Sequence, residues 1–346
     1  MRCRMKEQGF PMGNCLTNLL DRSIKPACEA TLKEKDGLYS RVITSAHLSR
    51  PEDYFSIYQS GCNHKCLKCH SWEFSKNFNG DWMTTEEIAD QCADYESILT
   101  YWEPRDRALM FTASDLCRHC GMCIREGIRH PRCPNKLSPN QVVLGPQGFG
   151  PARNIVAFTG GDIACCAEFY AQATEKIKER CTQEMHVLLE TNGYGLTPDN
   201  LDLLAEKGLD AFWLDIKAYD EDAYKKLCGT TNKWILDLPG QIKARGFALE
   251  ILSLFIPNWV ELDQLEKIFQ LVIQVDPNIP FTILAFFPQY KLTKNRPPEM
   301  LEMLQAYYLA KDMGLKRIRV GNLGVFLKSE RDIQLFTSLI NPDALG

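Results

Sequence analysis

Three cysteines on one short stretch of the chain could together hold a metal cluster. They are Cys62, Cys66 and Cys69, spaced C-x3-C-x2-C within the run Gly61 to His70. Three thiolates can bind three irons of a [4Fe–4S] cube and leave the fourth iron without a protein ligand. An open iron is a place where a small molecule can bind. The spacing leaves two alternatives open. The cysteines could form a structural zinc site that lacks one ligand, or they could be three unrelated buried thiols.

A second group of cysteines follows further along the chain. Cys117, Cys120, Cys123 and Cys133 are spaced C-x2-C-x2-C-x9-C, and Pro134 comes next. The pattern resembles half of a bacterial ferredoxin motif whose last gap is stretched. Four thiolates could close around an auxiliary [4Fe–4S] cluster that relays electrons or staples the structure. Zinc or a single iron held by the same four cysteines is the rival interpretation.

Composition and charge limit the class of protein. The chain has 346 residues, of which 45% are hydrophobic and 24% are charged, as in an ordinary globular protein. A net charge of -4 gives no electrostatic reason to expect a nucleic acid partner. The run Met1 to Gly9 lacks the apolar stretch of a signal peptide, and the apolar segment from Phe247 to Val260 is too short to span a bilayer. We therefore expect a cytoplasmic protein with no membrane partner.

The number of cysteines also favours a cytoplasmic location. Fifteen cysteines, an odd number, are more consistent with metal ligands and buried thiols than with disulfides in a reducing environment. Cys3, Cys15 and Cys28 are widely spaced, and we interpret them as packing or surface thiols. Cys165 and Cys166 receive no assignment.

Apolar runs alternate with helical patterns along most of the chain. Strands are expected at residues 54–58, 154–159, 186–191, 211–216, 247–254, 281–286 and 317–320. Helices are expected at residues 84–101, 199–207, 221–228, 261–274 and 298–313, and one more helix follows Gly160 and Gly161 and ends at about Arg180. Six or so apolar strands that alternate with helices predict an α/β fold with a parallel sheet, here a partial (β/α)6 barrel that is open on one side.

Three parts of the chain differ in pattern. Residues 1–50 show no strong period and form an N-terminal extension. Residues 104–153 are rich in Pro, Gly, Arg and Cys and form a Cys-rich, metal-binding insert. Residues 51–103 and 154–346 form the core.

The residues that could do chemistry fall at one edge of the predicted sheet. Cys62, Gly160, Glu190 and Asp215 each lie at or just beyond the C-terminal end of an expected strand. In parallel α/β sheets and barrels that edge carries the active site. We therefore expect one site that combines the first cysteine group with these residues.

Several short runs, taken together, resemble the radical S-adenosylmethionine (radical SAM) enzymes. These runs are Gly61 to His70, Ser71 to Ser75, Phe158 to Asp162, Glu190 to Gly193, Leu214 to Ala218 and Ala285 to Leu292. The chain is most similar to the group of the pyruvate formate-lyase activating enzyme and to the AmmeMemoRadiSam-system proteins. The resemblance covers about residues 52–325 without the insert. The insert occupies the place where activating enzymes of glycyl-radical enzymes carry ferredoxin inserts.

The resemblance implies a reaction. The open iron would chelate S-adenosylmethionine, and one electron from the cluster would break a C–S bond to give a 5'-deoxyadenosyl radical. That radical would take a hydrogen atom from a protein or peptide, as in an activase or a post-translational modification enzyme. A flavodoxin or ferredoxin would serve as the low-potential electron donor. The cofactor carries the difficult step, and the protein positions and protects it.

The resemblance also implies roles for individual residues. Gly160 and Gly161 would let backbone carbonyls approach the methionine amine, because no Cβ intervenes. Asp162 stands where relatives carry the longer Glu, and Lys68 stands where relatives carry an aromatic residue near the adenine. The resemblance also places four residues around the methionine carboxylate and a bound monovalent cation: Glu190, Thr191, Asp215 and Lys217.

Two other functions are compatible with the motifs. One is a radical SAM methyltransferase that acts on a protein, with cobalamin as a candidate cofactor, although the chain has no Asp-x-His-x-x-Gly cobalamin motif. The other is a non-catalytic iron–sulfur electron carrier or a zinc-stabilised interaction protein. The open C-x3-C-x2-C site argues against this second alternative.

Overall fold

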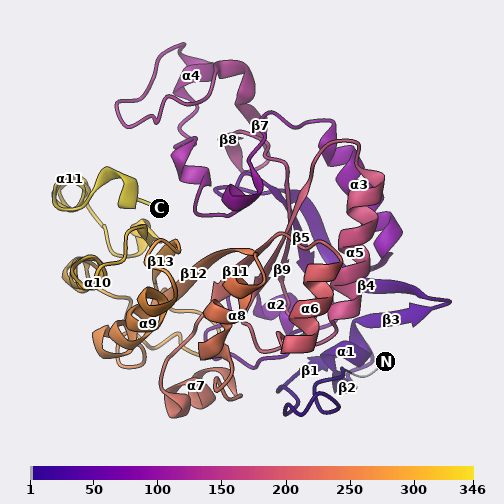
Figure 1. The fold of residues 1–346 in the computed structure, drawn as a ribbon. Coiled ribbons are helices and arrows are strands. Elements are labelled where there is room, and N and C mark those ends of the chain that lie inside the picture. The colour runs from indigo at the N-terminus through magenta and orange to yellow at the C-terminus, as the bar shows by residue number, and fades with distance from the viewer. Residues whose placement is uncertain (1–2) are drawn as a thin grey trace.

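A single sheet organises the molecule, and the computed structural model describes residues 3–346 (Figure 1). Within these residues the main sheet has ten strands in the order β14-β13-β12-β11-β10-β9-β5-β4-β3, with β6 paired to β4. Its parallel strands are β5 (Phe55–Gln59), β9 (Ile155–Gly160), β10 (His186–Thr191), β11 (Ala211–Asp215), β12 (Ala248–Phe255), β13 (Phe281–Ala285) and β14 (Ile318–Gly321). Each matches an expected strand. Neighbours in this parallel part follow chain order, so the α/β architecture of an open, barrel-type sheet is confirmed.

Helices cover the outer face of the sheet (Figure 1). They are α3 (Thr85–Glu96), α5 (Ala167–Arg180), α6 (Pro198–Glu206), α7 (Glu221–Cys228), α8 (Leu238–Ala244), α9 (Leu262–Val275), α10 (Met300–Met313) and α11 (Glu330–Leu339). Helix α3 begins at a capping box, in which Thr84 and Glu87 exchange hydrogen bonds. It ends five residues earlier than expected, because the backbone amides of Thr100 and Tyr101 donate to the carbonyl of Ala152 instead.

The N-terminal extension joins the main sheet. Its elements are β1 (Leu16–Asn18), β2 (Ile24–Pro26), α1 (Ala27–Ala30), β3 (Leu32–Lys35) and β4 (Leu38–Leu48). Strand β4 runs antiparallel to β5, with Ala46 opposite Ile57, and also pairs with β6 (Asp81–Thr84). The sequence placed no strand before residue 54, so this is a difference from expectation. Residues 1 and 2 of the extension lie outside the described part.

The insert packs against the N-terminal ends of the parallel strands. It contains α4 (Met122–Arg125), β7 (Val143–Gly145) and β8 (Gly148–Gly150). Its first part enters the inner face of the sheet, where Leu109 and Phe111 pack with Tyr54 and Leu188. The backbone amide of Phe111 donates to Glu250 Oε2 at 2.6 Å. This part of the insert therefore fills the N-terminal end of the open barrel.

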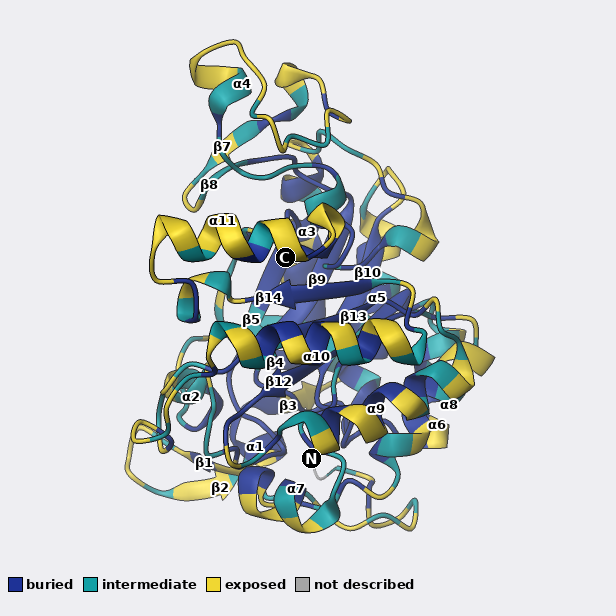
Figure 2. Ribbon diagram, turned by 90° about the vertical axis from the view of Figure 1, so that its left-hand side faces the viewer, coloured by how far each residue is buried: buried dark blue, intermediate teal, exposed yellow. Residues whose placement is uncertain are grey.

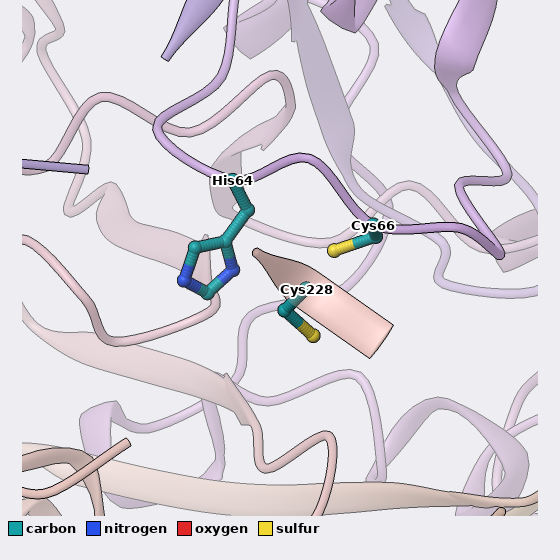
Figure 3. Close-up of side chains that lie close together, drawn as sticks. All are labelled: His64, Cys66 and Cys228. Carbon is teal, nitrogen blue, oxygen red and sulfur yellow. The ribbon is translucent and has the colours of Figure 1, made fainter. Parts of the chain in front are cut away.

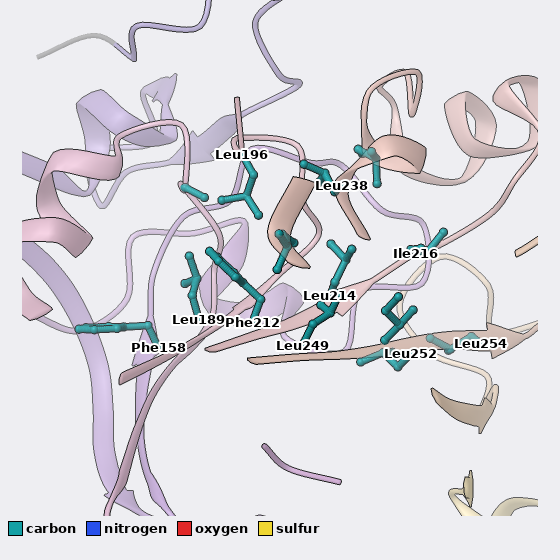
Figure 4. Packing of buried hydrophobic residues seen from close by; sticks show 14 of the residues in the cluster. Phe158, Leu189, Leu196, Phe212, Leu214, Ile216, Leu238, Leu249, Leu252 and Leu254 are labelled. Carbon is teal, nitrogen blue, oxygen red and sulfur yellow. The ribbon is translucent and has the colours of Figure 1, made fainter. Parts of the chain in front are cut away.

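The main core lies between the sheet and the outer helices. Figure 2 shows buried strands behind helices whose outer faces are exposed. Figure 4 shows the packing of Phe158, Leu189, Phe212 and Leu214, all fully buried. Strands covered on both faces are apolar almost throughout, which explains why they could be identified from sequence. No helix within residues 3–346 combines the length and the apolar character needed to cross a membrane.

Candidate functional site

The first cysteine group lies on a loop at the C-terminal end of β5, and we call residues 61–70 the cysteine loop. Cys62 and Cys66 are buried, and Cys69 is partly buried. The end of α7 fixes the loop, because the amides of Lys65 and Leu67 donate to the carbonyls of Cys228 and Leu227, both at 2.8 Å. The loop conformation is therefore set by backbone contacts as well as by its side chains.

Hydrogen-bond donors surround the sulfur atoms of this loop. Cys62 Sγ accepts from the backbone amide of His64 at 3.5 Å and from Asn192 Nδ2 at 3.9 Å. Cys69 Sγ lies 3.1 Å from Ser75 Oγ. Hydrogen bonds to sulfur stabilise thiolates and tune the potential of a cluster that they bind. The donor set therefore fits an iron–sulfur cluster.

Burial changes the acidity of these thiols. It raises the pKa of Cys62 to about 11 and also raises the pKa of Cys69. The contact with Cys228 lowers the pKa of Cys66 well below its usual range. A buried thiol with a raised pKa loses its proton readily only when a cation binds, so binding of metal and release of protons are coupled here.

Two residues beside Cys66 were not predicted from sequence. Cys228 and His64 lie close to it, and the ligand atoms of all three residues are within 4.8 Å of one another (Figure 3). The ring of His64 packs between Tyr194 and Tyr224, at centroid distances of 5.3 and 5.7 Å. Among the described residues its ring nitrogens have no hydrogen-bond partner. Cys228 is a single cysteine at the end of an expected helix and belongs to no cysteine motif, so the sequence did not indicate that it lies at this site.

The glycines after β9 approach the cysteine loop closely. A Cβ on Gly161 would lie 2.2 Å from the carbonyl oxygen of Gly61, and Gly160 has a φ of +86°. Only glycine fits both positions without a shift of the backbone. The buried Arg41 joins the two loops, since its Nη2 donates to the carbonyls of Gly61 at 3.3 Å and Gly161 at 3.1 Å.

Arg41 is a second functional candidate that sequence reasoning missed. Its Nε donates to Gln59 Oε1 at 2.8 Å, and its Nη1 donates to Thr31 Oγ1 at 3.2 Å. Within residues 3–346 the structure gives it no carboxylate partner. A fully buried cation is costly unless its donors are satisfied. Arg41 therefore holds its position through the carbonyls that it brings together.

Asp162 bonds to the neighbouring loop. Its carboxylate accepts from the amide of Ala164 at 2.8 Å, from Thr191 Oγ1 at 2.7 Å and from the amide of Asn192 at 2.8 Å. Its backbone carbonyl accepts from the amide of Asn63 at 2.7 Å. Asp162 and Thr191 thus connect the loops after β5, β9 and β10, in addition to any contact with a ligand.

Charged groups gather beside the cysteine loop at the end of β11. Lys217 Nζ forms an ion pair with Asp215, whose Oδ1 is buried and has no partner among the described residues. Burial opposes the charge of Lys217, but Asp215 and Cys66 outweigh it and raise its pKa. Burial, with Lys217 close by, lowers the pKa of Lys68 to about 8. The two lysines carry positive charge, and Asp215 carries negative charge and an oxygen without a partner. These groups together fit a zwitterionic ligand such as an amino acid.

Glu190 lies on the inner face of the sheet, apart from these charges. Tyr54 Oη donates to it at 2.8 Å, and Thr159 Oγ1 bonds to its other oxygen. Burial raises its pKa to about 8. Within residues 3–346 no hydrogen bond or ion pair links Glu190 to Asp215 or Lys217. The structure therefore brings together Asp215, Lys217 and Lys68 but gives Glu190 partners that the sequence did not predict.

The segment after β13 covers the cysteine loop. Tyr290 stacks on Trp72 at a centroid distance of 5.3 Å, and Phe287 meets the ring of His70 edge-on at 5.4 Å. The amide of Lys291 donates to the carbonyl of Leu67 at 3.0 Å. Three of the short runs noted in the sequence, Gly61 to His70, Ser71 to Ser75 and Ala285 to Leu292, thus meet here.

The second cysteine group also comes together. Cys117, Cys120, Cys123 and Cys133 line one small cavity in the insert. Cys117 Sγ accepts from the amide of His119 at 3.3 Å. Burial raises the pKa of Cys117 to about 11. Cys133 Sγ accepts from Arg129 Nη1 at 3.8 Å. Four thiols around one cavity, with donors to two of the sulfurs, fit a closed metal centre.

The two cysteine groups lie at opposite ends of the sheet. His119 Nε2 of the insert contacts Asp53, just before β5, at 2.9 Å, whereas the cysteine loop follows the last residue of β5. In Figure 1 α4 of the insert is at the top of the molecule, and α7, which holds the cysteine loop, is at the bottom. Since a strand rises about 3.3 Å per residue, the two groups are separated by at least roughly 15 Å.

Comparisons with known proteins show which proteins the chain is similar to. The profile of the Radical SAM superfamily matches residues 117–272. This match includes β9 to β12 but begins after the cysteine loop, so it does not test the roles of Cys62, Cys66 and Cys69. The chain is 31% identical over 144 residues to a provisionally named glycyl-radical enzyme activating enzyme of Methanocaldococcus jannaschii. It is 34% identical over 142 residues to an uncharacterized protein of the same organism.

These relatives are matched only in part. The two alignments each cover 40% of this chain, and they cover 53% and 41% of the relatives. Among solved structures, a domain of the pyruvate-formate lyase-activating enzyme from Bacteroides vulgatus is 18% identical, with a TM-score of 0.41 over 48% of this chain and 98% of that one. SuiB of Streptococcus suis is 14% identical, with a TM-score of 0.46 over 80% of this chain and 50% of that one.

The matched residues contain the parallel strands whose C-terminal ends carry Gly160, Glu190 and Asp215. The activating-enzyme name of one relative agrees with the resemblance found in the sequence. From the family profile and this relative, we conclude that the chain carries a radical SAM domain.

Proposed function

We propose that this chain cleaves S-adenosylmethionine at a [4Fe–4S] cluster bound by Cys62, Cys66 and Cys69 and abstracts a hydrogen atom from a protein or peptide. One observation carries the proposal: three thiols on a buried loop lie beside the Lys217–Asp215 ion pair. The radical SAM domain supports the chemistry, and the M. jannaschii relative supports an activating enzyme. The cluster and S-adenosylmethionine together would supply the one-electron cleavage that yields the 5'-deoxyadenosyl radical.

The residues at the end of β11 would bind the methionine part of the cofactor. Lys217 and Lys68 offer positive charge for its carboxylate, and the free Oδ1 of Asp215 can accept from its amine or bind a monovalent cation. Gly160 and Gly161 let the loop after β9 pack directly against the cysteine loop and Phe74, because a Cβ on either glycine would meet these neighbours. Asp162, Thr191 and Asn192 act as positioning residues, because they hold the surrounding loops through mutual hydrogen bonds.

Other residues would exclude water and tune the sulfur atoms. The stacked pair Trp72–Tyr290 and the ring of Phe287 cover one side of the cysteine loop. The sulfur atoms of Cys228 and Cys66 lie within 4.8 Å of each other, so we assign Cys228 as a hydrogen-bond donor to the Cys66 sulfur. If Cys66 and Cys228 bound two different irons of one cluster, the cluster would separate their sulfur atoms. Such a separation does not fit the short distance between them. The fourth iron corner would then stay open.

The insert would hold a second metal centre. Cys117, Cys120, Cys123 and Cys133 would bind an auxiliary [4Fe–4S] cluster, with zinc or a single iron as the rival occupant. Its place at the far end of the sheet favours a stapling role over direct contact with S-adenosylmethionine. A flavodoxin or ferredoxin would be the electron donor, as the family resemblance implies.

Product analysis tests this function. The full chain is reconstituted anaerobically with iron and sulfide, reduced with dithionite and mixed with S-adenosylmethionine. We expect 5'-deoxyadenosine from the wild type and from Cys181→Ala, a matched cysteine variant far from the loop, but none from Cys66→Ala. Absence of 5'-deoxyadenosine with an intact reduced cluster would refute the proposal. S-adenosylhomocysteine together with bound cobalt would identify the methyltransferase instead.

A further inference from the structure

Three side chains at the cysteine loop bring together ligand atoms that suit a single metal ion. His64 and Cys66 lie on the loop, and Cys228 is the last residue of α7. The ligand atoms of the three residues all lie within 4.8 Å of one another (Figure 3). This set of two thiols and one imidazole shares only Cys66 with the set Cys62, Cys66 and Cys69.

Backbone hydrogen bonds hold Cys66 beside Cys228. The amides of Lys65 and Leu67, on either side of Cys66, donate to the carbonyls of Cys228 and Leu227, both at 2.8 Å. The two thiols are buried at this junction of the loop and the helix. Their proximity therefore follows from the path of the main chain and does not depend on a contact between the side chains.

The imidazole of His64 is fully buried and polar, yet nothing in the described chain satisfies it. Its ring packs between the rings of Tyr194 and Tyr224, and Lys76 Nζ donates to its backbone carbonyl. Within residues 3–346 neither ring nitrogen has a hydrogen-bond partner. A buried polar group without a partner is costly, and a bound ion is one way in which proteins satisfy such a group. The two thiols beside this ring are the ligands that such an ion would need.

We propose that His64, Cys66 and Cys228 bind one zinc ion when the chain carries no iron–sulfur cluster at the loop. Thiolates and neutral imidazole are the usual zinc ligands, with Zn–S bonds of about 2.3 Å and Zn–N bonds of about 2.0 Å. Ligand atoms of a tetrahedral zinc site are then roughly 3.5 to 3.8 Å apart. The three residues meet this requirement, because their ligand atoms all lie within 4.8 Å of one another. Two thiolates also balance the double charge of the ion in this buried place.

Zinc at this place would exclude the proposed cluster. Cys66 belongs to both ligand sets, so its sulfur cannot bind zinc and an iron of the cube at the same time. The zinc form of the chain would therefore be inactive until iron and sulfide displace the ion. This consequence rests on the proposed function, whereas the zinc site itself does not and is measured without S-adenosylmethionine.

Zinc counting with two groups of variants tests the site. The full chain is prepared anaerobically without a cluster, loaded with Zn²⁺ and separated from excess metal. We expect His64→Gln and Cys228→Ser to hold one zinc ion per chain fewer than the wild type, whereas Cys69→Ser and the control Cys181→Ser keep the wild-type number. Loss of the ion in Cys69→Ser but not in His64→Gln would place zinc on the three cysteines of the loop and overturn the proposal. Equal zinc in all these proteins would overturn it as well.

A second measurement uses only the wild type and so does not depend on whether the variants fold. The cluster-free chain is loaded with ¹¹³Cd²⁺ in place of zinc, and its ¹¹³Cd nuclear magnetic resonance spectrum is recorded. The chemical shift depends on the number of sulfur ligands, so a site with two sulfurs is distinguished from the four cysteines of the insert. We expect a two-sulfur signal that is coupled to imidazole protons. Signals from sites with three or four sulfurs alone would contradict the proposal.

The same signal tests the exclusion of the cluster. When iron and sulfide are added, we expect the two-sulfur signal to disappear as a cluster assembles at the loop. Persistence of the signal beside an assembled cluster at the loop would contradict the exclusion. If no cluster assembles at the loop and the signal persists, the proposed function fails while the signal itself supports the metal site.

Discussion

The cysteine loop and the insert bring cysteines together at opposite ends of the same sheet, and the residues around the two groups differ. The loop offers three thiols, and beside them lie Lys68, Lys217 and Asp215. The insert offers four thiols around one cavity, and beside them His119 contacts Asp53 of the core. Three sulfur ligands leave one iron open, whereas four close the coordination sphere. We therefore propose that the cysteine loop, with three thiols next to unsatisfied polar groups, is the reactive centre.

The largest expected difference between the two regions is in the cleavage of S-adenosylmethionine. Cys66→Ala would remove a ligand of the proposed open cluster, so we expect 5'-deoxyadenosine formation to fall at least about 100-fold. Cys120→Ala removes a ligand at the distant end of the sheet and should leave a measurable part of the activity. Both variants are compared by product analysis after anaerobic reconstitution. Complete loss in Cys120→Ala with the first cluster still assembled would overturn this division.

A smaller effect is expected from the glycine that touches the cysteine loop. In Gly161→Ala the new Cβ would meet the carbonyl oxygen of Gly61, so the two loops must separate. We expect a roughly tenfold or greater loss of cleavage, with the metal content of the insert unchanged. Gly240→Ala is the matched control, because a Cβ there meets only Val275 at 3.9 Å. Equal activity in the two variants would show that the close approach is unimportant.

A substitution of Arg41 should weaken the binding of S-adenosylmethionine at the cysteine loop and leave the insert unchanged. Arg41→Met removes the donors to the carbonyls of Gly61 and Gly161, so we expect weaker binding of S-adenosylmethionine. The readout is the change in the electron paramagnetic resonance spectrum of the reduced cluster on titration with S-adenosylmethionine. A purely structural role would lower the melting temperature without moving this titration. An unchanged titration midpoint in folded Arg41→Met would therefore contradict a positioning role.

The smallest expected effect concerns Glu190, between the two regions. Burial raises its pKa from 4.5 to about 8, so the folded chain binds more protons than the unfolded chain between these pH values. The stability contributed by the neutral carboxyl is complete below about pH 4.5 and is lost as the pH rises toward 8. Glu190→Gln should lose less stability than the wild type over this range in urea unfolding under anaerobic conditions. Identical pH dependence in both proteins would count against the raised pKa.

The sequence predicted the parallel sheet well because its strands are apolar on both faces. The strands β5 and β9 to β14 and the helix α7 match their expected positions. Strand β4 was not predicted, because its buried and exposed residues do not alternate regularly. Local pattern therefore identified the centre of the sheet better than its antiparallel edge.

The candidate site was predictable where its residues share a short motif. Cys62, Cys66 and Cys69 are neighbours in sequence, and Asp215 and Lys217 end a recognisable strand. Arg41 and Cys228 were missed because their partners are distant in the chain; Arg41, for example, contacts a carbonyl 120 residues away. Only folding brings these groups together.

The open iron is tested most directly by labelling the cofactor. Reduced protein is mixed with S-adenosylmethionine that carries ¹⁷O in its carboxylate, and electron–nuclear double resonance is recorded. Coordination to the cluster predicts a hyperfine coupling to ¹⁷O in the wild type and in Cys228→Ala. No coupling in the wild type, with coupling in Cys228→Ala, would mean that Cys228 caps the fourth iron and would contradict the account.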